Sequence, residues 1–187
     1  MPEGKSWQRI AKRIRVPLGF LFAAVYLWRA RPTPLTLALS VLLVLPGLAL
    51  RAYASGYVKK NAELTTSGPY AYTRNPLYLG SLMIAFGFGA ASGSTLLVIL
   101  LAVLFASIYV PTILGEEQYL RDHFAEFNAY ADKVPRLLPR ITAAAGLGER
   151  GAFSQALYRK HREHNALLGS VGIYLVLIAR LLLARSR

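Results

Sequence analysis

The run NPLYLGSLMIAFGFGAASGSTLLVILLAVLFASIYVPTILG, residues 75–115, contains 41 residues without Asp, Glu, Lys or Arg. An α-helix rises about 1.5 Å per residue and the hydrocarbon core of a bilayer is about 30 Å thick, so one crossing needs roughly 20 residues. The run therefore predicts two membrane-spanning helices. The small residues GAASGS, 89–94, predict the turn between them.

Further apolar stretches lie on either side of this run, at residues 16–28, 32–50 and 165–184, the last interrupted only by Arg180. Together they predict an all-α integral membrane protein with about five transmembrane helices, at 10–29, 34–55, 76–90, 94–115 and 165–184. A cleaved signal peptide is the alternative for the N-terminus, but no small-x-small cleavage site precedes Arg29.

Composition supports a membrane protein and excludes other classes. Only 17% of residues are charged and 55% are hydrophobic, whereas a soluble domain has about 25% charged residues. A disordered or nucleic-acid-binding arm is therefore excluded. The absence of cysteine excludes a disulfide scaffold and metal sites that need thiolate.

The net charge of +13 reports on membrane topology. If the N-terminus is cytoplasmic, 17 of the 22 basic residues lie on the cytoplasmic side, as the positive-inside rule requires. The polar segments 56–75 and 116–164 then face the cytoplasm, as do all nine acidic residues. We therefore expect any polar chemistry, and a cofactor pocket, on that side.

The segment TSGPYAYTRNPLYLG, residues 66–80, lies between the second and third predicted helices. Gly68 and Pro69 indicate a turn, and Asn75 and Pro76 suit the N-cap and first position of the third helix. Helix propensity does not explain the tyrosines and the arginine around them. A helix N-terminus can also bind an anionic group.

Glu116 and Glu117 directly follow the fourth predicted helix. A carboxylate pair at a helix C-terminus opposes the helix dipole. The pair either marks the membrane boundary or binds a cationic group such as a sulfonium or an amine. The aromatic and apolar residues that follow have the spacing of one face of an interfacial helix, which VPRLLP at 134–139 ends: Tyr119, Leu120, Phe124, Phe127 and Tyr130.

These segments together resemble the isoprenylcysteine carboxyl methyltransferase and phospholipid methyltransferase superfamily of membrane enzymes. The resemblance covers about residues 60–140 and depends on an ordered set of motifs. They are Gly68-Pro69-Tyr70-x-Tyr72-x-Arg74-Asn75-Pro76-x-Tyr78-Leu79-Gly80, then Glu116-Glu117, Leu120, Phe124 and Tyr130, and finally Val134-Pro135-Arg136-x-x-Pro139.

The resemblance implies methyl transfer from S-adenosylmethionine to a lipidic or prenylated acceptor at the membrane–cytosol interface. The residues that it assigns to the cofactor are Arg74, Asn75, Tyr78, Leu79, Gly80, Glu116, Glu117, Val134 and Pro135. One glutamate would hold the amino group of the cofactor. Carboxyl methyltransferases of this kind have His where this chain has Asn75, which loosens the substrate assignment more than the cofactor assignment.

The acceptor determines what further groups the reaction needs. A carboxylate is already ionised and needs only a cation to position it. Arg74, Arg121 and Arg136 are the candidates, and Arg74 and Arg136 are the predicted catalytic residues. An amine must lose a proton first, and His123 is the candidate base nearest to the glutamates. The alternatives are a phospholipid N-methyltransferase, an NADPH-dependent sterol-type reductase, which the scaffold also resembles, and a non-enzymatic lipid-binding protein.

We expect residues 1–187 to form a single membrane domain, of which the C-terminal part is a continuation. Residues 143–151 indicate a linker, and a basic stretch from Ser154 to Asn165 precedes the last helix. Such a stretch favours contact with anionic lipid headgroups. His161 and His164 are three residues apart, but no third metal ligand is evident.

Overall fold

The computed structural model describes residues 17–58, 63–146 and 151–185. The elements in these ranges are all helical. They are helix Pro17–Arg29, α2 (Pro34–Ser55), the 3-10 helix η1 (Gly68–Ala71), α3 (Pro76–Ala91), α4 (Thr95–His123), α5 (Phe127–Lys133), α6 (Gln155–Lys160) and α7 (His164–Arg185). The predicted all-α fold is confirmed.

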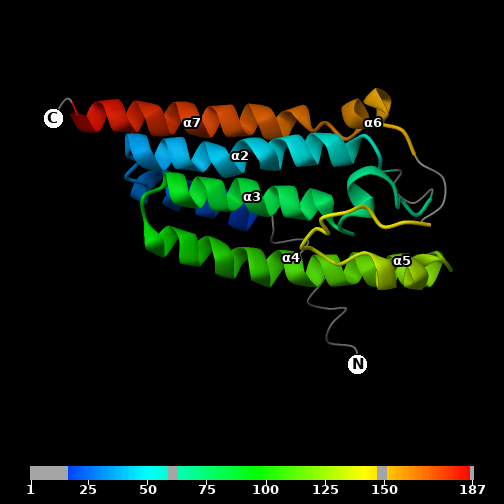
Figure 1. The fold of residues 1–187 in the computed structure, drawn as a ribbon. Coiled ribbons are helices and arrows are strands. Elements are labelled where there is room, and N and C mark those ends of the chain that lie inside the picture. Colours follow the sequence, from blue (N-terminus) through cyan, green and yellow to red (C-terminus); the bar gives the residue numbers. More distant parts are fainter. Residues whose placement is uncertain (1–16, 59–62, 147–150, 186–187) are drawn as a thin grey trace.

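Three of these helices, α2, α4 and α7, are long and apolar enough to cross a membrane. Helix Pro17–Arg29 and α3 are shorter apolar helices beside them. The long helices lie roughly parallel, and α5, α6 and η1 gather at one end of the bundle (Figure 1). All five predicted spans have a counterpart, although residues 10–16 of the first lie outside the described residues.

Local sequence explains where the helices begin. Thr33 caps α2 in a reciprocal capping box with Thr36, and Pro34 occupies the first helical position. The predicted turn between α3 and α4 is confirmed at Ser92–Ser94. There Gly93 has a φ of +63°, which glycine adopts without steric cost.

The fourth helix is longer than predicted. It runs to His123 rather than ending at 115, so Glu116 and Glu117 lie inside the helix and not at its C-terminus. The prediction equated the end of the apolar run with the end of the helix. The apolar run marks only the span suited to a membrane, and the backbone hydrogen bonds continue beyond it.

The predicted interfacial helix is also corrected. Tyr119 and Leu120 belong to α4, whereas Phe127 and Tyr130 belong to α5, and the chain is extended at Phe124 between them. Leu120 and Phe124 still pack against Phe127 and Tyr130 in one hydrophobic cluster. The apolar residues therefore come together across a break between two helices.

Helices α2 and α3 pack very closely. A Cβ on Gly47 would lie 2.8 Å from the carbonyl oxygen of Gly80, and a Cβ on Gly80 would lie 2.8 Å from that of Gly47. Gly87 likewise faces Val44 and Ser40 of α2. These glycines let two backbones approach, as small residues do in membrane helices.

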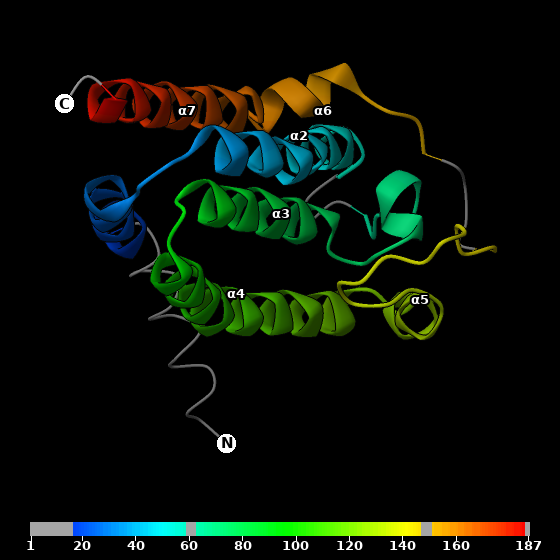
Figure 2. The same cartoon turned by 60° about the vertical axis from the view of Figure 1, so that its left-hand side comes forward.

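The hydrophobic core lies toward the end of the bundle that carries the α3–α4 turn, seen at the left of Figures 1 and 2. Tyr26, Val44, Phe88, Leu97 and Leu177 are its largest buried members. The Tyr26 hydroxyl donates to the Phe88 carbonyl at 2.7 Å, and the hydroxyls of Ser40 and Tyr174 lie 2.7 Å apart. The opposite end holds the smaller cluster around Phe127 and Tyr130 and most of the polar side-chain contacts.

Candidate functional site

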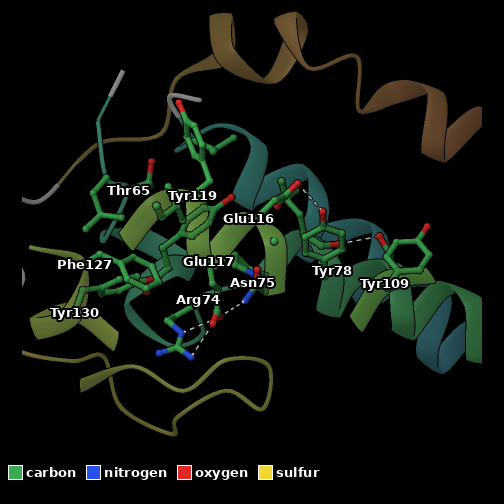
Figure 3. A pocket seen from close by; sticks show the side chains of 18 of the residues that line it. Thr65, Arg74, Asn75, Tyr78, Tyr109, Glu116, Glu117, Tyr119, Phe127 and Tyr130 are labelled. Atoms are coloured by element: carbon green, nitrogen blue, oxygen red, sulfur yellow. Dashed lines mark hydrogen bonds and ion pairs between the residues drawn. The ribbon is translucent and has the colours of Figure 1, made fainter. Parts of the chain in front are cut away.

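A cavity of about 830 Å³ opens at the polar end of the bundle. It lies where the end of α2, the start of α3 and the last turns of α4 meet α5 and η1 (Figure 3). Small-molecule sites typically measure about 300–1,000 Å³, so the cavity has the size of a cofactor site. Its chemically important lining residues are Arg51, Glu63, Tyr70, Arg74, Asn75, Tyr78, Tyr109, Glu116, Glu117, Tyr119, Tyr130 and Glu163.

Glu117 is the buried centre of a polar network. Arg74 donates to its two carboxylate oxygens through Nε at 3.1 Å and through Nη2 at 3.3 Å. Asn75 Nδ2 donates to Oε1 at 3.1 Å, and Arg136 Nε donates to Oε2 at 3.0 Å. The side chains of Glu117 and Arg74 are only 5% and 11% exposed. Two cations and an amide thus hold one carboxylate, which is how a buried charge is tolerated.

Further hydrogen bonds join the segment before α3 to the segment after α5. Arg74 N–H donates to the Pro135 carbonyl at 2.9 Å, and Arg140 N–H donates to the Tyr72 carbonyl at 2.9 Å. The Thr73 hydroxyl donates to the Leu137 carbonyl at 3.0 Å. The segment after α5 is therefore tied along the segment before α3, although more than 60 residues separate them.

Asn75 precedes α3 as predicted, but its side chain does not cap the helix. Its amide donates instead to Glu117 Oε1 and, at 2.9 Å, to the Arg136 carbonyl. Pro76 occupies the first helical position. The N-cap interpretation was right about the position and wrong about the role: Asn75 links α4 to the segment after α5.

Glu116 occupies a different environment from its neighbour. It is exposed, points into the cavity and accepts a hydrogen bond of 2.8 Å from the Tyr78 hydroxyl (Figure 3). The Tyr78 ring meets Tyr109 edge to face with centroids 5.7 Å apart. Glu116 is thus the carboxylate of the pair that is accessible to a ligand.

Two buried tyrosines form a further wall of the cavity. The Tyr130 hydroxyl donates to the Tyr70 carbonyl at 2.7 Å. Burial raises the pKa of both phenols well above the usual value, because the charged form would lose its hydration. Both therefore act as neutral hydrogen-bonding groups near neutral pH.

The structure brings together five of the predicted site residues, Arg74, Asn75, Tyr78, Glu116 and Glu117, at the cavity. Arg136 reaches this group through Glu117 and remains half exposed. The other predicted residues do not line the cavity and their contact with a cofactor stays a prediction. Leu79 and Gly80 lie on α3, Val134 is buried in the cluster with Phe127, and Pro135 pairs with the Arg74 backbone.

Sequence reasoning missed Arg51 and Glu163, which pair with each other at the cavity. Two signals were available. Arg51 is the first charged residue after the uncharged stretch 32–50, and Glu163 is the one acidic residue in the basic stretch 154–165. A charge that ends a long uncharged stretch, or an acidic residue alone among basic ones, suggests a specific partner.

The histidines lie away from the cavity lining. The His123 ring stacks on Tyr119 with centroids 3.9 Å apart, and its Nδ1 lies 2.8 Å from the Tyr119 carbonyl oxygen. His161 Nδ1 lies 3.1 Å from the Ser55 carbonyl oxygen. Within the described ranges, no group of three or more His, Cys, Asp or Glu residues is placed to hold a metal ion.

Fold and site together define a helical integral membrane protein with a polar, cofactor-sized cavity at one end of its bundle. Residues 36–126, from the first turn of α2 to the start of α5, match the phospholipid methyltransferase family. The chain is also 27% identical over 154 residues to the protein-S-isoprenylcysteine O-methyltransferase of Schizosaccharomyces pombe, a match that covers 74% of this chain and 61% of that protein. The resemblance to this superfamily is thereby confirmed.

Two bacterial relatives are more similar in sequence. The chain is 34% identical over 139 residues to the cobalt-zinc-cadmium resistance protein CzcN of Cupriavidus metallidurans, covering 71% of this chain and 64% of the relative. It is 39% identical over 90 residues to the nickel-cobalt-cadmium resistance protein NccN of Alcaligenes xylosoxydans xylosoxydans, covering 48% and 41%. The chain thus spans less than two thirds of each relative. No solved structure matches it.

Proposed function

We propose that the protein is a membrane-embedded, S-adenosylmethionine-dependent methyltransferase that acts on a lipidic acceptor, as isoprenylcysteine carboxyl O-methyltransferases do. One observation carries the proposal. Arg74, Asn75 and Tyr78 converge with Glu116 and Glu117 on one cavity, and these residues lie inside the segment that matches a methyltransferase family.

The residues present fit this cofactor. S-adenosylmethionine has a sulfonium, an ammonium, a carboxylate and an adenosine, and when bound it would supply a methyl group on positively charged sulfur. The cavity offers the carboxylate of Glu116 for a cation, the guanidinium of Arg74 for a carboxylate, and the rings of Tyr78 and Tyr119 for a flat base. Carboxylates and aromatic faces both favour cations.

The chain's own residues would then act by alignment, because methyl transfer is an in-line displacement that depends mainly on positioning. Glu116 would orient the cationic part of the cofactor, and its hydrogen bond with Tyr78 holds it in place. Arg74 would hold the carboxylate of the cofactor, and the half-exposed Arg136 would help to hold an anionic acceptor. Glu117 would fix both arginines, since it already binds both.

A carboxylate acceptor agrees better with this lining than an amine. An amine needs a base, and no histidine lines the cavity in the described part of the chain. Phospholipid N-methylation remains the second candidate because the matching family carries that name. A sterol-type reductase and a lipid-binding module without catalysis are the further alternatives.

Calorimetric titration of the detergent-purified protein with S-adenosylhomocysteine tests the proposal. We expect saturable binding in the wild type and at least tenfold weaker binding in Glu116→Gln, because a charge-assisted contact contributes about 1.5–3 kcal/mol. Glu126→Gln, at the start of α5, is the matched control. Saturable binding of NADPH without binding of S-adenosylhomocysteine would favour the reductase, and binding of neither would favour the lipid-binding module.

A further inference from the structure

Arg51 is a preorganised anion-binding group at the edge of the cavity. It follows the 19 uncharged residues 32–50 and lies near the end of α2. Its Nη1 donates to the Leu77 carbonyl at 3.3 Å and to the Ser81 hydroxyl, both on α3. The first turns of α3 therefore fix the guanidinium before any ligand arrives.

The Nε and Nη2 groups of the Arg51 guanidinium form a bidentate ion pair with the carboxylate of Glu163. Nε donates to Oε2 at 3.0 Å and Nη2 donates to Oε1 at 2.9 Å. The two side chains are 24% and 10% exposed, and both line the cavity. Two parallel charge-assisted bonds are the geometry with which arginine recognises a carboxylate or a phosphate.

Glu163 comes from a part of the chain that is separate from the matched segment. It lies between α6 and α7, whereas the family match ends at residue 126 and includes Arg51. Its neighbour Arg162 has a φ of +53°, a backbone conformation that non-glycine residues rarely adopt. The α6–α7 junction therefore has a left-handed backbone residue directly before the glutamate that pairs with Arg51.

We propose that Arg51 recognises the anionic group of the lipidic acceptor. In the absence of acceptor, Glu163 accepts the two N–H groups of Arg51 that this anionic group would accept in its place. The inference rests on the proposed function, because it names the acceptor end of the same cavity. A phosphate or a carboxylate would accept the same two N–H groups.

Equilibrium binding of lipid probes to the full-length protein in detergent tests this assignment. The probes are a short-chain phosphatidic acid, N-acetyl-S-farnesylcysteine and the methyl ester of the latter. We expect Arg51→Gln to weaken binding of at least one anionic probe about tenfold or more, and Glu163→Gln to strengthen it severalfold. The methyl ester should not respond. Which anionic probe responds identifies phosphate or carboxylate as the acceptor's group.

The matched control is Arg159→Gln, which removes the same charge from the exposed face of α6 near Glu163. Equal weakening by Arg51→Gln and Arg159→Gln would mean surface electrostatics and would overturn the assignment. Weaker binding in Glu163→Gln would overturn the displacement. Arg51→Lys keeps the charge without the bidentate geometry, so it should lose part of the affinity even if Arg51→Gln fails to fold.

Titration with S-adenosylhomocysteine separates this inference from the proposed function. If Arg51→Gln abolishes binding of S-adenosylhomocysteine, Arg51 belongs to the cofactor site and the acceptor assignment is wrong. If the wild type binds no S-adenosylhomocysteine but Arg51→Gln still loses the anionic lipid, the methyltransferase proposal fails while Arg51 remains an anionic-lipid site.

Discussion

Glu116 and Glu117 are adjacent in sequence but lie in different environments. Glu117 is buried and held by Arg74, Asn75 and Arg136, whereas Glu116 is exposed to the cavity and held by Tyr78. Consecutive helical residues point about 100° apart, so one can enter a buried network while its neighbour faces a ligand. The pair therefore divides into a buried structural carboxylate and a carboxylate that faces the cavity.

This division predicts different outcomes for the same substitution at the two positions. Glu117→Gln should lower the free energy of unfolding by about 3–5 kcal/mol, because it leaves buried arginine charge without its partner. Glu116→Gln should change stability by less than about 1 kcal/mol and instead weaken S-adenosylhomocysteine binding. Thermal unfolding in detergent and calorimetry measure the two effects. Equal loss of stability in both variants would contradict the division.

The buried tyrosines predict a loss of stability in alkali. The pKa of Tyr130 is raised in the folded protein, so above about pH 10 the unfolded chain releases its proton first and stability falls as the pH rises. Tyr130→Phe should reduce the slope of unfolding midpoint against pH between 9 and 11. Tyr72→Phe, at an exposed position, is the control. An unchanged slope in Tyr130→Phe would show that other groups dominate.

At the scale of the helices, the close contact of α2 and α3 predicts where one added methyl group lowers the stability of the fold. Gly80→Ala would place a Cβ 2.8 Å from the Gly47 carbonyl oxygen, and such overpacking costs about 1–3 kcal/mol. Gly169→Ala on α7, where nothing lies within 4 Å, should be neutral or slightly stabilising. The measurement is the unfolding midpoint of both variants in one detergent.

The same pair of variants also tests the predicted cofactor contact of Gly80. If Gly80 serves only helix packing, Gly80→Ala should bind S-adenosylhomocysteine within about threefold of the wild type once the protein is folded. A larger loss at full folding would place the glycine against the cofactor.

The helices show which parts of the fold could be predicted from the sequence. Apolar runs predicted the positions of five apolar helices, because membrane thickness imposes a characteristic length on such runs. In the described part of the chain, three of the five, α2, α4 and α7, are long enough to cross a membrane. The end of α4 and the role of Asn75 were not predictable in this way. The role of Asn75 depends on Arg136, which lies 61 residues after it and meets it only in the folded chain. The end of α4 at His123 lies beyond the apolar run, so membrane thickness does not determine it. The site motifs indicated which residues converge, but not that Glu117 would be enclosed by two arginines.

The contact between Arg51 and Glu163 also could not be predicted from the sequence. The two residues are 112 positions apart, and no helical periodicity relates them. Only the packing of the α6–α7 junction against α2 places them together. Long-range ion pairs of this kind are specified by tertiary structure, so sequence patterns can mark each partner as unusual without joining them.

At the scale of the whole molecule, the two ends of the bundle differ in charge and chemistry. The cavity and the segments around α5, α6 and η1 lie at one end, and the α3–α4 turn lies at the other (Figure 1). The charge pattern of the sequence favours the same division: if the N-terminus is cytoplasmic, 17 of the 22 basic residues are predicted on the cytoplasmic side, together with the polar segments 56–75 and 116–164. The positive-inside rule therefore predicts a cytoplasmic cavity, where a soluble cofactor reaches it directly.

Cysteine labelling can test this orientation cleanly, because the chain has no cysteine of its own. Thr142, beyond α5, is exposed at the cavity end, and Thr95, at the first turn of α4, is exposed at the other. In intact cells, a membrane-impermeant maleimide should label Thr95→Cys and leave Thr142→Cys unlabelled, and permeabilisation should reverse the protection of the latter. Labelling of Thr142→Cys alone in intact cells would show that the topology is the reverse of the predicted one. The cavity would then lie on the side of the membrane that a cytosolic cofactor does not reach. The positive-inside bias disfavours that result, because it would require most of the basic residues to be on the side from which they are normally excluded.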